Sequence, residues 1–137
     1  MERPLTASFE NDGRGMVFVG QGVISGEQMI KQSEKAYSPA VLAKLRYQII
    51  DLRNVERMDI TSEQMRQLAM LDRRAAEQSA GGKIAIVASH DLTVGLSRIY
   101  SAYAQSPELD AKIFPTMEEA RAWVEDTGSR EASARLS

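Results

Sequence analysis

Short apolar runs alternate with amphipathic stretches along the whole chain. Residues 5–10, "LTASFE", alternate as a half-buried strand does, and a glycine-rich "NDGRG" turn leads into a second apolar run at residues 16–24. This pattern predicts a β-hairpin at the amino end. Ser25 and Gln28 have the spacing of a capping box, which predicts that a helix begins there and ends before the "SPA" at residues 38–40.

Three strand-then-helix units follow in the second part of the chain. Residues 47–52 and 83–88 are continuous apolar runs typical of buried strands, and "AKIFPT" predicts a last short strand. Thr61 with Gln64, and Thr116 with Glu119, predict capped helix starts. For the helix after Thr61 we expect the following buried stripe: Met65, Leu68, Ala69, Leu71 and Ala75. The rest of its "MRQLAMLDRRAAEQ" segment is interpreted as a solvated face.

The order of these elements predicts a single α/β domain. It is a mixed, mostly parallel five-stranded sheet flanked by about four helices, in the order β-β-α-β-α-β-α-β-α, with one antiparallel edge strand. We expect the two fully apolar strands, 47–52 and 83–88, at the centre of the sheet. The domain is predicted to span residues 1–125, and residues 126–137, "DTGSREASARLS", to form a polar, flexible tail.

Composition removes several function classes. The 137 residues carry a net charge of −2, which gives no strong positive field for nucleic acid, and no run approaches the roughly 18 apolar residues of a membrane span. The absence of cysteine removes disulfides, thiol nucleophiles and thiolate metal ligands. We expect a soluble cytoplasmic protein with no nucleic-acid partner and no cofactor.

Polar residues gather after two of the predicted strands. Ligands of open α/β sheets bind outside the carboxyl ends of the strands, so these residues are the candidate binding or regulatory site. They are Asp51, Arg53, Asp59, Thr61 and Ser62 from one unit, and Ser89, His90 and Asp91 from the next.

The order of elements and two segments carry a family resemblance. The segments "IIDLRNVERMDITSEQM" and "KIAIVASHDLTVGLSRIYSAYAQSPELDAKIFPTMEEARAWV" resemble the STAS and SpoIIAA-like superfamily, and most closely its SpoIIAA-like branch. The resemblance covers roughly residues 3 to 125 and implies a small regulatory α/β domain. In STAS anti-sigma-factor antagonists a partner kinase phosphorylates a serine at a helix start, within a "DSSG"-type motif. Structural relatives of the fold bind lipids.

The segment "MDITSE" matches that phosphoacceptor motif, with Thr61 in the place of the acceptor serine. The glycine after the acceptor is missing, and Ser62 and Glu63 stand there instead. Glu63 would repel a phosphate at the same helix start. An N-cap hydroxyl, which stabilises a helix by ~1 kcal/mol, explains the spacing from Thr61 to Gln64 without phosphorylation.

The remaining chemical motifs have plain structural interpretations. His90 lies in a contiguous "SHD", and three consecutive side chains diverge too much to form a triad. We interpret His90 as an exposed loop residue beside Asp91, the expected N-cap of the next helix, and we expect no metal site. The "GQGVISG" segment lacks the third glycine of a dinucleotide-binding fingerprint, because Ser25 stands at that position. Its glycines favour a bulge or close packing instead.

Three classes of function stay open at this stage. The first is a non-enzymatic regulatory or protein-interaction module that binds a partner near the start of the helix after Asp59. The second is a binder of a small apolar, lipid-like or anionic ligand. The third is an enzyme, ranked last because no nucleophile with a base, paired acids or metal cluster has a suitable spacing. Trp123 is predicted to be core, whereas Tyr100 and Tyr103 are either core or part of a ligand cavity or homodimer surface.

Overall fold

The computed structural model describes residues 4–126, so most of the predicted tail at 126–137 lies outside the described residues. The predicted hairpin is present: β1 (Leu5–Glu10) and β2 (Gly15–Ser25) pair antiparallel, and η1 (Asn11–Gly13) turns the chain between them. Asn11 and Asp12 have left-handed backbone angles, with φ of 52° and 56°. Asn and Asp tolerate that conformation better than most residues, so the "NDG" sequence suits this turn.

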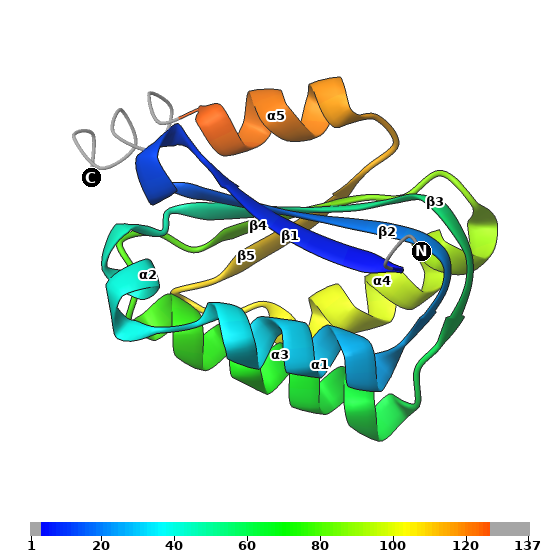
Figure 1. The fold of residues 1–137 in the computed structure, drawn as a ribbon. Helices are drawn as coiled ribbons and strands as arrows, with labels where there is room; N and C mark the ends of the chain where they lie inside the picture. The colour runs from blue at the N-terminus through cyan, green and yellow to red at the C-terminus, as the bar shows by residue number, and fades with distance from the viewer. Residues whose placement is uncertain (1–3, 127–137) are drawn as a thin grey trace.

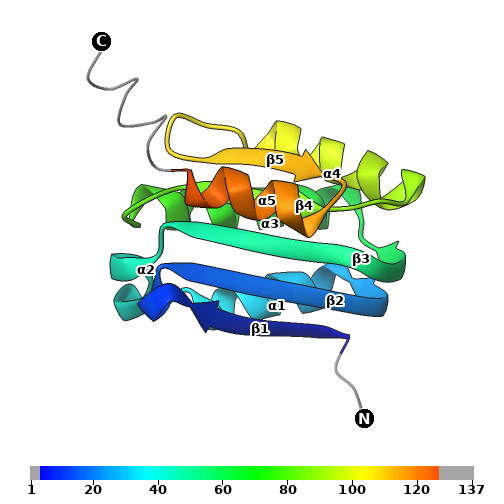
Figure 2. The same cartoon turned by 90° about the horizontal axis from the view of Figure 1, so that it is seen from above.

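One five-stranded sheet forms the centre of the molecule, in the order β1-β2-β3-β4-β5 (Figures 1 and 2). β3 (Tyr47–Asp59), β4 (Lys83–Val87) and β5 (Asp110–Phe114) run parallel to β2, so in the described part of the chain the edge strand β1 alone is antiparallel. The register sets Tyr47 beside Lys83 and Asp51 beside Val87. The predicted parallel pairing of the two apolar strands, and the mixed sheet, are therefore confirmed.

The helices are divided unequally between the two faces of the sheet. Within residues 4–126, one face carries four helices and the other carries α5 (Met117–Glu125) (Figure 1). The four are α1 (Gly26–Ala36), α2 (Pro39–Lys44), α3 (Ser62–Glu77) and α4 (Asp91–Ala104). α2 is an additional helix that the sequence analysis missed. Its start follows ordinary rules, because Ser38 caps it by accepting from the Val41 amide and Pro39 occupies its first position.

β3 is longer than predicted. The apolar run ends at Leu52, but the strand continues to Asp59 and the expected loop is absent. Beyond Asp51 it pairs only with β2, so the two strands project past the sheet as a two-stranded ribbon. The pairing shifts register between Val19 and Gln21 and again between Gly22 and Val23, and Gly22 has a φ of 64°. The prediction that these glycines permit a bulge is confirmed.

Two apolar cores lie on the two faces of the sheet. The smaller core, under α5, contains Ile49 and Val87, and Trp123 packs against it while remaining partly exposed. The prediction that Trp123 is core is therefore only partly correct. The larger core lies under α1 to α4 and includes the following fully buried residues: Met16, Ile24, Val55, Ile84 and Leu109.

Gly82, just before β4, lies close to the backbone of Glu108, and the absence of a side chain allows this contact. A Cβ atom at this position would lie 1.9 Å from the Glu108 carbonyl oxygen, which belongs to backbone and cannot rotate away. We expect Gly82→Ala to lower the free energy of unfolding by about 1–3 kcal/mol, the usual cost of overpacking. Chemical denaturation measures this directly. Ala80→Ser, at an exposed position two residues earlier, is the control and should change stability by no more than about 0.5 kcal/mol.

Candidate functional site

Two helix starts lie side by side at the end of the β2–β3 ribbon. Ser25, which caps α1, pairs with Asp59 across the ribbon, and Asp59 lies just before the α3 cap. The two starts touch, because a Cβ at Gly26 would lie only 2.5 Å from the Gln64 side-chain oxygen. The ribbon therefore brings the beginnings of α1 and α3 to one end of the molecule.

Thr61 is the N-cap of α3, as predicted. Its hydroxyl accepts from the Gln64 amide at 3.1 Å, and the Gln64 side chain accepts from the Thr61 amide at 3.0 Å. This capping box satisfies two amides that would otherwise lack partners at the helix start. Ser62 is the first helical residue and is exposed, and Glu63 places a carboxylate in the positive first turn.

Asp51 and Arg53 do not belong to this helix start, contrary to the prediction. Asp51 precedes Asp59 by eight strand residues, roughly 26 Å along an extended strand, because β3 continues where a loop was expected. Asp51 and Arg53 instead form a bidentate ion pair with two hydrogen bonds of 2.9 Å. Burial acts to raise the pKa of Asp51, but the hydrogen bonds and charge of Arg53 outweigh it and hold that pKa below its usual value.

Asp59 has its own partner at the ribbon end. Its carboxylate pairs with Arg57 through contacts of 3.0 and 3.2 Å, and both side chains are largely exposed. The two arginine–aspartate pairs of β3 thus serve separate parts of the strand. The candidate residues of this unit form two groups rather than one site.

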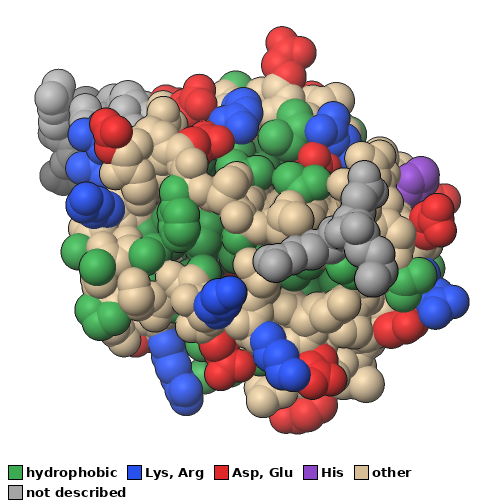
Figure 3. Space-filling view, viewed as in Figure 1, with side chains coloured by type: hydrophobic (Ala, Val, Ile, Leu, Met, Phe, Trp, Pro, Cys, Tyr) green, Lys and Arg blue, Asp and Glu red, His purple; other side chains and the backbone are tan. Residues whose placement is uncertain are grey.

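Ser89, His90 and Asp91 form an exposed turn between β4 and α4. The prediction that Asp91 is the N-cap is wrong. His90 has extended backbone angles and occupies the cap position without a side-chain hydrogen bond, while Asp91 is the first helical residue. Thr93 donates from its hydroxyl to the His90 carbonyl at 2.9 Å. His90 is exposed, as expected, and is the purple side chain at the edge of Figure 3.

Within residues 4–126, no group of three or more His, Cys, Asp or Glu side chains could hold a metal ion. None of the helices in the same range is long and apolar enough to cross a membrane. On the face drawn in Figure 3, acidic and basic side chains are interspersed, with no large region of either sign.

A buried polar cluster in the helix layer was missed by the sequence analysis. Asp72 of α3 is only 4% exposed, whereas Leu71, which was predicted to be buried, is partly exposed. Tyr37, the C-cap of α1, donates to one Asp72 oxygen at 2.7 Å, and Tyr100 of α4 donates to the other. Gln48 of β3 donates to the Tyr37 hydroxyl at 2.6 Å. The cluster links three helices to the sheet.

The signal for this cluster was present in the helical periodicity. Met65, Leu68, Asp72 and Ala75 follow the three- and four-residue spacing of one helix face. Because Asp72 is charged, the sequence pattern did not predict that this position belongs to the buried face of α3. Two tyrosines on neighbouring helices supply the hydroxyls that a buried carboxylate requires.

Burial sets the protonation behaviour of the cluster. It raises the pKa of Asp72 to about 6, although the hydrogen bonds from Tyr100 and Tyr37 act in the opposite direction. Burial also raises the pKa values of Tyr37 and Tyr100 well above the usual range, and the Asp72 charge adds to that effect. Both tyrosines therefore remain hydroxyl donors at neutral pH.

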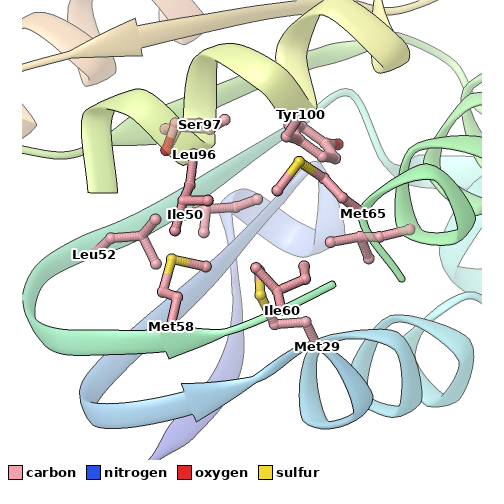
Figure 4. A pocket seen from close by; sticks show the side chains of 11 residues that line it. Met29, Ile50, Leu52, Met58, Ile60, Met65, Leu96, Ser97 and Tyr100 are labelled. Carbon is pink, nitrogen blue, oxygen red and sulfur yellow. The ribbon is translucent and has the colours of Figure 1, made fainter. Parts of the chain in front are cut away.

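A small apolar cavity lies beside this cluster, between α1, α3, α4 and the ribbon (Figure 4). Met29, Met58 and Met65 line it, together with Ile60, Leu96 and the ring of Tyr100. Its volume is about 30 Å³. Ligand sites usually enclose roughly 300–1,000 Å³, so the cavity as it stands is too small for a lipid chain.

A larger groove runs over the outer surface between α1 and α3. Its volume is about 370 Å³, and it begins at Glu63 in the first turn of α3. Ile30, Met70 and Leu71 supply its apolar part. Charged and polar side chains of both helices surround them: Glu34, Glu63, Arg66, Gln67 and Arg74. The groove is thus amphipathic and carries both signs of charge.

Comparison with known proteins identifies the fold. No protein-family model and no curated protein matches the sequence. Among solved structures, the chain is similar to an uncharacterised protein of the DUF3478 family with a SpoIIAA-like fold from Shewanella loihica PV-4. The TM-score is 0.52 and the identity 17%, over 88% of this chain and 91% of that one.

The chain is also similar to the anti-sigma factor antagonist SpoIIAA in its unphosphorylated form. Here the TM-score is 0.57 and the identity 14%, over 89% of this chain and 98% of that one. The protein therefore has a SpoIIAA-like fold, as the resemblance of its sequence segments implied.

The capping role of Thr61 gives a direct test. Thr61→Ala removes the acceptor for the Gln64 amide and should lower the free energy of unfolding by ~1 kcal/mol. Thr61→Asp retains an acceptor at the cap and should keep nearly full stability. Urea denaturation of the three proteins measures both changes. Equal stability of Thr61→Ala and the wild type would show that the capping box contributes nothing.

The buried carboxylate predicts an unusual pH dependence. The pKa of Asp72 in the folded protein, about 6, is above its ordinary value of 3.8, so protonation favours the folded state between these values. Its contribution is present at low pH and lost as pH rises through 6. We expect unfolding to cost roughly 1–1.5 kcal/mol more at pH 5 than at pH 7.5 from this group alone.

Asp72→Asn separates this group from the others, because an amide does not titrate while its oxygen still accepts from a tyrosine. The difference in unfolding free energy between pH 5 and pH 7.5 should shrink by the amount above. An identical pH dependence in wild type and variant would refute the assignment. The carboxylates of Glu10 and Asp51 have lowered pKa values, so their effects fall at more acidic pH.

Proposed function

We propose that the protein is a non-enzymatic regulatory module that binds a protein partner in the groove between α1 and α3. The observation that carries the proposal is the groove itself, an open amphipathic depression of about 370 Å³ that begins at the helix start after Asp59. The SpoIIAA-like fold supports a regulatory role, since a solved structure of that fold is an anti-sigma factor antagonist. A cytoplasmic location is part of the proposal.

The chemistry of the groove indicates the kind of partner. Met70 is 39% exposed, and methionine adapts its shape to different apolar side chains. Arg74 lies on the α3 side and Glu34 on the α1 side, so the groove offers both signs of charge, whereas Arg66 already pairs with Glu63 at 3.6 Å. An amphipathic helix, with apolar residues on one face and charges along its edges, fits such a groove.

Two alternatives have less support. A small apolar ligand would have to enlarge the methionine-lined cavity about tenfold to reach the usual size of a ligand site. Phosphorylation of Thr61 would break the capping box and place about −1.5 to −2 charges beside Glu63. None of the site residues predicted from the sequence lines the groove itself: Asp51, Arg53, Asp59, Thr61, Ser62, Ser89, His90 and Asp91.

Affinity capture from the native cell tests the proposal. Wild-type protein should capture a partner. Met70→Glu should capture at least about tenfold less of it, because the new carboxylate would occupy the apolar part of the groove. Ala122→Glu, an exposed position on α5 at the opposite face of the sheet, is the matched control and should retain the partner. Equal capture by all three proteins would refute the groove as the binding surface.

The Thr61→Asp variant and intact-mass analysis test whether partner binding is controlled by phosphorylation at the start of α3. We expect Thr61→Asp to bind the same partner nearly as well as the wild type, and the purified protein to carry no phosphate. Loss of binding in a stable Thr61→Asp variant, together with phosphate at Thr61 or Ser62, would establish a switch and contradict this expectation.

A further inference from the structure

α4 carries an exposed apolar face that the groove does not use. Leu92 is 61% exposed, Ile99 49% and Tyr103 37%, and Leu96 lies between them partly exposed. These four residues are spaced by four, three and four positions, so they form one continuous stripe along the helix. Ala102 is exposed beside the stripe. Isolated exposed apolar residues are ordinary, but a stripe along a whole helix marks a contact surface.

Gly95 borders the stripe between Leu92 and Ile99, on the side of the helix that also carries Asp91 and Arg98. It is exposed, and a Cβ built there would meet nothing within 4 Å. No contact in residues 4–126 therefore requires a glycine at this position. A glycine inside a helix costs about 0.5–1 kcal/mol relative to alanine. The value of a residue without a side chain is that a second backbone can approach closely.

Charged residues flank the apolar face in a self-complementary order. Asp91 lies at the beginning of α4, and Arg98 lies two turns later, both exposed. When two copies of α4 cross antiparallel near Gly95, Leu92 of each faces Ile99 of the other. The same crossing brings Asp91 of one copy near Arg98 of the other, twice, and sets the helix dipoles in opposite directions.

We propose that α4 is the interface of a two-fold symmetric homodimer, with two copies of the helix antiparallel and crossing near Gly95. The interface adjoins the α1–α3 groove at Arg66, whose guanidinium lies 5.8 Å from the centre of the Tyr103 ring. A net charge of −2 opposes self-association only weakly. α4 has 14 residues and is ~21 Å long, so its face buries less than the roughly 800 Å² per partner of a standard interface. We therefore expect a weak dimer that forms as the protein concentration rises.

Sedimentation velocity over a series of protein concentrations tests the proposal. The wild type should shift from monomer to dimer, and Ile99→Asp should weaken dimerisation at least about tenfold. Gly95→Ala gives the sharper test. Its methyl group should raise the thermal stability of the monomer, because it favours the helix, yet weaken the dimer several-fold by keeping the backbones apart. Ala122→Glu on α5 should dimerise as the wild type does.

The charge pairs test the antiparallel arrangement. Asp91→Arg and Arg98→Asp should each weaken the dimer, since each places like charges together, and the double variant should restore it. A protein that stays monomeric at all concentrations would overturn the proposal and leave the α4 face to a helix of a different protein. A dimer that Ile99→Asp and Gly95→Ala leave unchanged would overturn it as well.

Discussion

The carboxylate of Asp72 needs hydrogen-bond donors inside the helix layer, because a buried ion without partners would cost several kcal/mol. Tyr37 brings one hydroxyl from the end of α1 and Tyr100 brings the other from α4, while Gln48 anchors Tyr37 to the sheet. Three helices and the central strand thus meet at one group. The distance between α1 and α3 sets the width of the outer groove. The packing of α3 against α4 places Arg66 over the ring of Tyr103.

The length of β3 is the second constraint on the surface. Because this strand continues past β4, its end carries the beginnings of α1 and α3 away from the β4–α4 turn. A shorter strand would have placed Asp51, Thr61 and His90 around one crevice, as in many α/β proteins. The ribbon instead carries Thr61 away from Asp51, which stays beside Val87, and from the turn at His90. The surface beside Thr61 is therefore made by the starts of two helices.

Local patterns in the sequence were sufficient for most of the fold. The starts of α1 and α3 were predicted from the capping boxes at Ser25 and Thr61. The parallel pairing of β3 and β4 was predicted from their apolar runs. The second half of β3 was missed because it is largely polar and pairs with β2 alone, so no apolar run marks it. Asp72 was misjudged because its charge favours solvent, and only the tertiary fold brings two tyrosines to it. The groove and the α4 face likewise depend on how helices pack, which periodicity within one helix does not determine.

The two surfaces of the helix layer share one residue. Arg66 lines the α1–α3 groove, and its guanidinium lies 5.8 Å from the centre of the Tyr103 ring on α4. A substitution of Arg66 would therefore affect both surfaces, whereas Met70 and Ile99 report on them separately. Ile30 and Met70 lie between α1 and α3, so pairing through α4 would leave the apolar part of both grooves open. A partner with two binding segments could then engage both copies at once, and the second contact would form at a high effective concentration. Weak self-association would in that case strengthen partner binding without any new contact in the groove.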